Sequence, residues 1–192
     1  MKAFLQQIVA VLRGALDSSG RLLTLGRLDY RTSQMEATLQ GKTWFVQGKV
    51  TATSTQYGSV QIWNPLTSGK TLQISSVLAA VETAGKVYPF LENSAKGSVP
   101  GSGAAVLNNK ANVTDSPSFE IRTQSAAAAT TPLITEGIQV TSTLPSGQGL
   151  LISGQSIVLP PGYGCRFEYA VTTQKYLIIS ATITEIDNAQ VT

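Results

Sequence analysis

The feature that most constrains this chain is a hydrophobic period of two, which runs through residues 43–186. Short segments alternate apolar and polar side chains, and turn-forming Pro, Gly, Asn and Ser separate one segment from the next. Such alternation buries one face of an extended segment and leaves the other face to solvent. No helical pattern stands between the segments, so the sequence predicts an all-β antiparallel sandwich or barrel.

The expected strands are defined by their apolar positions. They lie within residues 44–52, 60–62, 72–74, 87–90, 119–121, 134–140, 151–152, 157–159, 167–171 and 177–183. The last strand is predicted to place Leu177, Ile179, Ala181 and Ile183 on one inward face. Residues 94–131, rich in Ser, Gly and Ala, interrupt the pattern. They are expected to form a long loop on one edge, as a solvated surface or a binding element.

A different period marks the N-terminus, where apolar residues recur every three or four positions. The stripe consists of Phe4, Leu5, Ile8, Val9, Val11, Leu12 and Leu16, with Arg13 and Arg21 adding positive charge. A helix of this length is marginal alone, so its stripe must dock on a neighbouring protein or on its own sandwich. Residues 1–42 are therefore predicted to be an amphipathic helix and connector, an attachment arm that precedes a sandwich domain at 43–192.

The residue types in the chain give little support for a catalytic function. The chain has no histidine and one cysteine, Cys165, which excludes Ser-His and Cys-His nucleophiles and an intrachain disulfide. We expect Cys165 to be a small buried side chain. Three late carboxylates, Glu168, Glu185 and Asp187, are the candidates for a glycosidase pair. We interpret them as solvated strand and loop positions.

No cofactor or metal site is expected either. Asp187 with Asn188 lacks the alternating acidic run of a calcium loop. The sequence therefore predicts a protein that is not an enzyme.

The charge distribution and the aromatic residues limit the kinds of partner that the chain is expected to bind. Residues 1–42 hold six Lys and Arg against three Asp and Glu, while the rest has eight of each sign, which argues against nucleic-acid binding. No stretch approaches the ~20 apolar residues that span a bilayer, so no membrane partner is expected. Trp44 and Phe45 are predicted in the core. Tyr57, Trp63 and Tyr163 lie near turns and are candidates for a binding rim or for interface anchors.

Two segments together resemble a known family. Ile62–Ile74 carries Asn64-Pro65 and then Ser68-Gly69-Lys70, and residues 157–162 end in Pro160-Pro161-Gly162. Asn-Pro and Ser-Gly favour a tight passage between strands, and Pro cannot continue a strand ladder. In order and separation, the pair resembles small jelly-roll structural proteins of tailed-bacteriophage virions, of the capsid-decoration or the head- or tail-appendage type.

The resemblance implies a jelly-roll sandwich that forms part of a virion assembled in the host bacterial cytoplasm. It implies a homo-oligomer, with a homotrimer as the expected form, and partners such as capsid, portal or tail proteins. The sparse charge, 13% of residues against ~25% in typical proteins, also favours assembly over a free monomer. The alternative function is a carbohydrate- or receptor-binding module of a phage tail or of a secreted bacterial protein.

Overall fold

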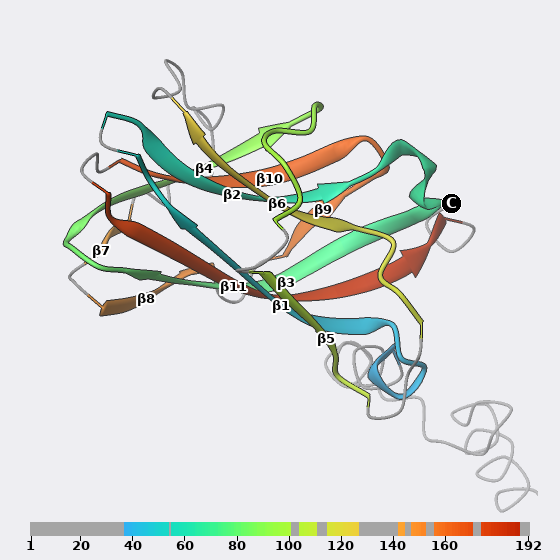
Figure 1. The fold of residues 1–192 in the computed structure, drawn as a ribbon. Coiled ribbons are helices and arrows are strands. Elements are labelled where there is room, and N and C mark those ends of the chain that lie inside the picture. The colour runs from blue at the N-terminus through green and yellow to red at the C-terminus, as the bar shows by residue number, and fades with distance from the viewer. Residues whose placement is uncertain are drawn as a thin grey trace, which may run out of the picture. The chain divides into compact units, whose positions relative to one another are not determined.

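Two antiparallel β-sheets stacked face to face form the sandwich (Figure 1). The computed structural model describes residues 37–53, 55–100, 104–110, 115–126, 142–144, 147–152, 156–170 and 174–188. The all-β sandwich predicted from the alternation is thereby confirmed. The predicted N-terminal helix and the expected strand at 134–140 lie outside the described residues.

Each sheet is named here after its first strand. The β1 sheet contains, in spatial order, β5 (Ala104–Asn108), β1 (Thr43–Thr51), β11 (Tyr176–Asp187), β3 (Lys70–Val81) and β8 (Gly147–Ile152), and β9 (Ile157–Leu159) pairs farther along β3. The β2 sheet contains β6 (Glu120–Ala126), β2 (Tyr57–Asn64), β10 (Tyr163–Tyr169), β4 (Gly85–Glu92) and β7 (Ser142–Leu144). A single turn of 3₁₀ helix, η1 (Leu66–Ser68), joins β2 to β3.

The strand order is that of a jelly roll. Without β5, β6 and β9, the two sheets read β1-β11-β3-β8 and β2-β10-β4-β7. Along the chain these strands alternate between the sheets from β1 to β4 and from β7 to β11, and the connection from β4 to β7 stays within the β2 sheet. This is the double Greek-key arrangement of eight strands that defines the jelly roll.

The prediction of one long loop across residues 94–131 is wrong, although β6 confirms the strand expected at 119–121. This interval contains β5 and β6, which lengthen the two sheets at the same edge, β5 beside β1 and β6 beside β2. Ala104 and Val106 pack against the core while Ala105 and Leu107 face solvent. Small alanine side chains weaken this alternation in the sequence, which explains why the strand was missed.

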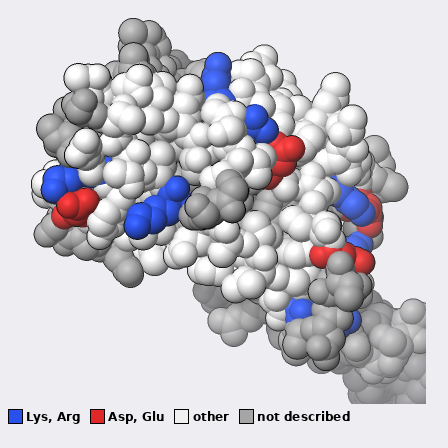
Figure 2. All heavy atoms as spheres, viewed as in Figure 1, with Lys and Arg blue, Asp and Glu red and all other residues white. Residues whose placement is uncertain are grey.

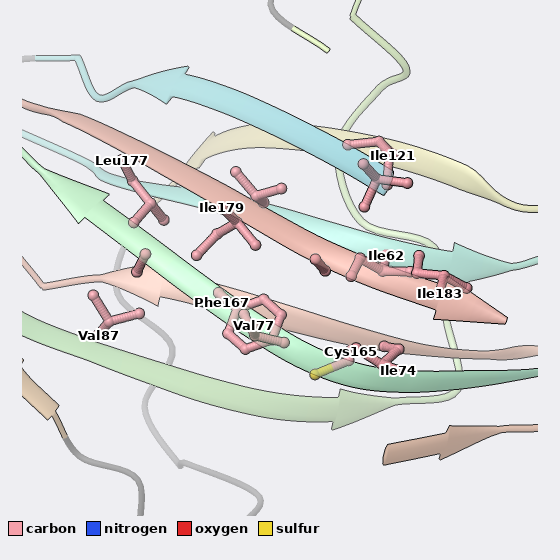
Figure 3. Packing of buried hydrophobic residues seen from close by; sticks show 14 of the residues in the cluster. Ile62, Ile74, Val77, Val87, Ile121, Cys165, Phe167, Leu177, Ile179 and Ile183 are labelled. Carbon is pink, nitrogen blue, oxygen red and sulfur yellow. The ribbon is translucent and has the colours of Figure 1, made fainter. Parts of the chain in front are cut away.

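The core lies between the sheets and is built from the predicted alternation. Leu177, Ile179, Ala181 and Ile183 on β11 are at most 2% exposed, which confirms their inward face. Figure 3 shows that side chains of both sheets, among them Ile74 and Phe167, fill the same space. Trp44 is buried as predicted. The prediction for Phe45 is wrong, because the next position on β1 points outward, and Phe45 is 40% exposed.

The two segments that resemble the phage proteins lie against each other. The buried Asn64 side chain donates from Nδ2 to the carbonyl oxygens of Lys70 and Leu159, at 2.9 Å each. The Gly162 amide donates to the Asn64 carbonyl at 2.8 Å. One asparagine thus joins the β2–β3 turn to the β9–β10 turn, which gives both motifs a structural role.

The compact sandwich unit begins at Ala37 rather than at Thr43. Asn108 Nδ2 donates to the Gly41 carbonyl at 2.6 Å, and the Glu185 amide donates to the Lys42 carbonyl at 2.9 Å. Lys42 also forms an ion pair with Asp187, 2.8 Å from Nζ to Oδ2. These contacts make residues 37–42, which the sequence analysis assigned to the arm, part of the sandwich.

Candidate assembly surface

The outer face of the β1 sheet is one of the two broad faces that the described strands present. Its outward residues that are at least partly exposed are Phe45, Gln47, Lys49, Thr51, Gln73, Ser76, Leu78, Ala80, Ala105, Leu107, Val158, Tyr176, Ile178, Ser180 and Thr182. At one end of the face, Thr43, Thr71 and Thr184 are buried. Phe45 and Leu107 are direct cross-strand partners, 40% and 61% exposed, and Val158 on β9 is 56% exposed. Apolar and hydroxyl side chains therefore dominate this face.

Charge is nearly absent from these outward positions. Lys49 is the one charged residue among them, and its Nζ lies 5.1 Å from the centre of the Tyr176 ring. Figure 2 shows few charged side chains on the side of the molecule that it displays, several of them as touching pairs of opposite sign. Burying such a face against another protein would desolvate few charges, and depletion of charge is typical of interface cores.

The outer face of the β2 sheet is different, because the chain itself covers it. Residues 93–100, here called the strap, leave β4 and run to β6. The Gln61 side chain holds the strap through the Ser94 carbonyl at 3.0 Å and the Lys96 amide at 2.8 Å. Ser98 and Thr123 exchange backbone hydrogen bonds of 3.1 and 2.9 Å. These contacts fix the strap across β2 to the far edge of β6.

A charged cluster lies on this covered face. Arg166 on β10 donates from Nε and Nη2 to Glu92 at 2.9–3.1 Å, and from Nη1 to Glu168 at 2.8 Å. Its guanidinium carbon lies 4.3 Å from the centre of the Phe90 ring. Burial acts to lower the pKa of Arg166, but the hydrogen bonds to both carboxylates outweigh it and raise that pKa. The cluster is a paired, buried structural unit.

The interpretation of Glu168 as a solvated residue is wrong. Its side chain does point away from the core, but it is only 5% exposed, because the outer face of β10 is covered. Period two places this side chain outward, but no local pattern shows that it is buried there beside Arg166.

The carboxylates considered for glycosidase chemistry do not form one facing set. Glu168 lies on the outer side of the β2 sheet, whereas Glu185 and Asp187 lie on β11 of the β1 sheet. Glu185 accepts hydrogen bonds from the Ser118 amide and hydroxyl at 2.6 and 2.7 Å. Asp187 binds Lys42 and Lys70, and these hydrogen bonds lower its pKa to about 2. Each of the three is thus engaged by its own partner.

Other chemical sites were sought across the described ranges. Cys165 is fully buried, as predicted, and burial raises the pKa of its thiol. No group of three His, Cys, Asp or Glu side chains in these ranges is placed to hold a metal ion. The same ranges contain no helix that is both long and apolar enough to cross a membrane.

The three aromatic residues proposed as a rim are not brought together. Tyr57 begins β2, and Trp63 lies near the opposite end of the same strand. Tyr163 begins β10 beside that end and is 47% exposed. Trp63 pairs with Gly164, so the side chains of Trp63 and Tyr163 alternate to opposite faces of the sheet. Trp63 and Tyr163 therefore cannot share one flat platform, and Tyr57 lies at the far end of β2 from both.

The predicted attachment residues lie outside the described residues. They are Phe4, Leu5, Ile8, Val9, Val11, Leu12, Arg13, Leu16 and Arg21. Comparisons with known proteins identified no relative of this chain. No protein-family model, curated protein or solved structure matches this chain.

Proposed function

We propose that this chain is a non-enzymatic structural component of a tailed-bacteriophage virion. In this proposal it assembles with copies of itself and attaches to the capsid or to the head–tail or tail assembly through its N-terminal arm. The observation that carries the proposal is the bare, nearly uncharged outer face of the β1 sheet. The jelly-roll strand order and the joined Asn64 and Gly162 turns support it by analogy with other virion proteins.

The β1 face has the composition that self-assembly requires. Exposed Phe45, Leu107 and Val158 lose apolar surface to solvent on association, at about 25 cal/mol per Å². Hydroxyl and amide groups around them can exchange hydrogen bonds with water for bonds with a partner. The resemblance to phage proteins makes a homotrimer the expected assembly.

The arm supplies the proposed attachment to other virion proteins. Its seven apolar side chains exceed what one short helix can hide, and docking four or five of them would contribute several kcal/mol at about 25 cal/mol per Å². Arg13 and Arg21 suit a partner with an acidic rim. The competing arrangement, in which the stripe packs on its own sandwich, remains an alternative for the same residues.

Deletion of residues 1–20 separates these two roles of the arm. The proposal requires a folded, soluble sandwich with an unchanged thermal transition that no longer joins the particle. Loss of the thermal transition would favour the folded-back stripe. Scrambling the order of residues 3–16 keeps their composition and is the matched control for the loss of the stripe.

The virion assignment is tested on particles made from the genome that encodes this chain. Gradient-purified particles should contain a 20.2 kDa chain at a fixed stoichiometry, and particles from a genome lacking its gene should not. Absence of the chain from intact wild-type particles would contradict the assignment. A glycan array tests the alternative function, and we expect no binding because the three rim aromatics do not share a platform.

A further inference from the structure

The edge strand β5 presents backbone groups that no described strand pairs. β5 pairs with β1 on one side and forms the end of the β1 sheet. Its sequence, Ala104-Ala105-Val106-Leu107-Asn108, contains no charge and no proline. Natural edge strands usually carry charges, prolines, bulges or a covering segment that prevent pairing with another chain.

The direction of these backbone groups follows from the ladder with β1. The Asn109 amide donates to the Thr43 carbonyl at 2.9 Å, so this pair is hydrogen-bonded. Hydrogen-bonded pairs alternate in an antiparallel ladder, which assigns Leu107 and Ala105 to bonds with β1. The N–H and C=O groups of Ala104, Val106 and Asn108 therefore point to the free edge.

The other edge at this end of the sandwich is protected. β6 carries Glu120 and Arg122, which pair with each other, and the strap occupies its outer side through the Ser98–Thr123 bridge. The two edge strands at this end thus differ: β6 is charged and paired with the strap, whereas β5 carries no charge and no other described strand than β1 pairs with it.

The free edge of β5 is complementary to itself. Antiparallel pairing of two copies centred on Val106 would place Ala104 of one copy opposite Asn108 of the other, with all outward groups matched. Lys110 of each copy would then lie at opposite ends of the paired strands, so like charges stay apart. Phe45 and Leu107, exposed beside this edge, would extend the contact with apolar surface.

We propose that two copies of this chain pair through β5, antiparallel and about a two-fold axis at Val106, to form one continuous sheet. This inference rests on the self-assembly proposed above and adds its geometry. An assembly that contains this contact has an even number of copies, and two trimers joined in this way satisfy that condition.

The test compares the full chain with two variants at Val106. Val106→Pro removes the outward N–H without touching a bond to β1, whereas Val106→Ala makes a similar loss of core contact and keeps the N–H. Native mass spectrometry should give an even multiple of 20.2 kDa for the wild type and for Val106→Ala, and half that mass for Val106→Pro.

Amide hydrogen exchange on the wild type tests the pairing without any variant. Dilution below the association range should speed exchange at Val106 by about tenfold or more, while exchange at Leu107, bonded to β1, changes less. If Val106→Pro does not fold, the exchange measurement on the wild type alone tests the β5 pairing.

The results that would contradict the β5 pairing differ from those that would contradict the proposed function. A wild-type trimer that Val106→Pro leaves intact would overturn the β5 pairing and leave the proposed function standing. Exchange at Val106 that is independent of concentration would also overturn the pairing. A wild-type monomer at all concentrations would remove both proposals.

Discussion

The two sheets of this jelly roll share one core, but their outer faces differ in covering and in charge. On the β2 sheet the strap covers the outer face, and Arg166 lies there paired with Glu92 and Glu168. On the β1 sheet the described outer positions carry apolar and hydroxyl side chains and one lysine. The eight residues of the strap lie on the β2 face, and the self-assembly proposed above would use the β1 face, so that assembly would be one-sided.

The largest effect is expected from Arg166→Met, which removes the cation that pairs with the carboxylates of Glu92 and Glu168. Breaking such a buried pair costs about 3–5 kcal/mol of unfolding free energy, measured by urea titration. The control is Lys49→Met, the same loss of a cation on the bare face, where a change below about 1 kcal/mol is expected. Equal losses in the two variants would remove the distinction between the faces.

Gly97→Ala tests how much the strap contributes to the stability of the sandwich. Gly97 has φ of 69°, and an added Cβ would lie 2.2 Å from the Thr123 carbonyl oxygen, which is backbone and cannot move freely. Gly69 has a similar φ of 64°, and a Cβ there would meet nothing within 4 Å. Gly69→Ala should cost about 1 kcal/mol from backbone strain alone.

Gly97→Ala should cost about 2–3 kcal/mol, because the collision adds to the same strain and loosens the strap. Thermal unfolding of the two variants measures the difference, and faster amide exchange at Thr123 should accompany the larger loss. Identical stability losses would mean that the strap contributes little to the covered face.

The smallest effect is expected at the exposed ion pairs on the end of β11. Asp187 has a pKa lowered from 3.8 to about 2 by Lys42 and Lys70, so its contribution is present above pH 3.8 and is lost as pH falls through 2. Its side chain is 38% exposed, and Asp187→Asn should therefore cost under about 1 kcal/mol at pH 7. The difference from wild type should shrink as pH falls from 4 to 2 and vanish below pH 2, and an undiminished difference at pH 2 would contradict this.

The sequence predicted the parts of the fold that depend on local alternation. The inward row on β11 and the burial of Trp44 and Cys165 followed from period two and residue type. β5 escaped detection because alanine on both faces weakens the alternation. Glu168 was misassigned because period two places it outward but does not show that it is buried there, paired with Arg166. The side on which Phe45 lies depends on the register of β1 with its neighbours.

The candidate site was the least predictable part. The sequence suggested a rim of Tyr57, Trp63 and Tyr163, but strand β2 separates the first two. The bare β1 face could not be foreseen, since it is defined by which segments do not cover it. To identify this face, the strand order of both sheets must be known, and no local sequence pattern contains that order.

The most direct test of the one-sided assembly uses engineered cysteines as probes of each face. The chain's only cysteine, Cys165, is buried, and burial raises the pKa of its thiol, so it gives little background reaction. Gln47→Cys reports the β1 face and Tyr88→Cys the β2 face. Their labelling rates with a thiol reagent are measured from nanomolar to high micromolar protein.

The account predicts that labelling of Gln47→Cys slows as the chain associates, while labelling of Tyr88→Cys does not change. Slower labelling at Tyr88→Cys alone, or unchanged labelling at both positions in a sample that native mass spectrometry shows to be assembled, would contradict it.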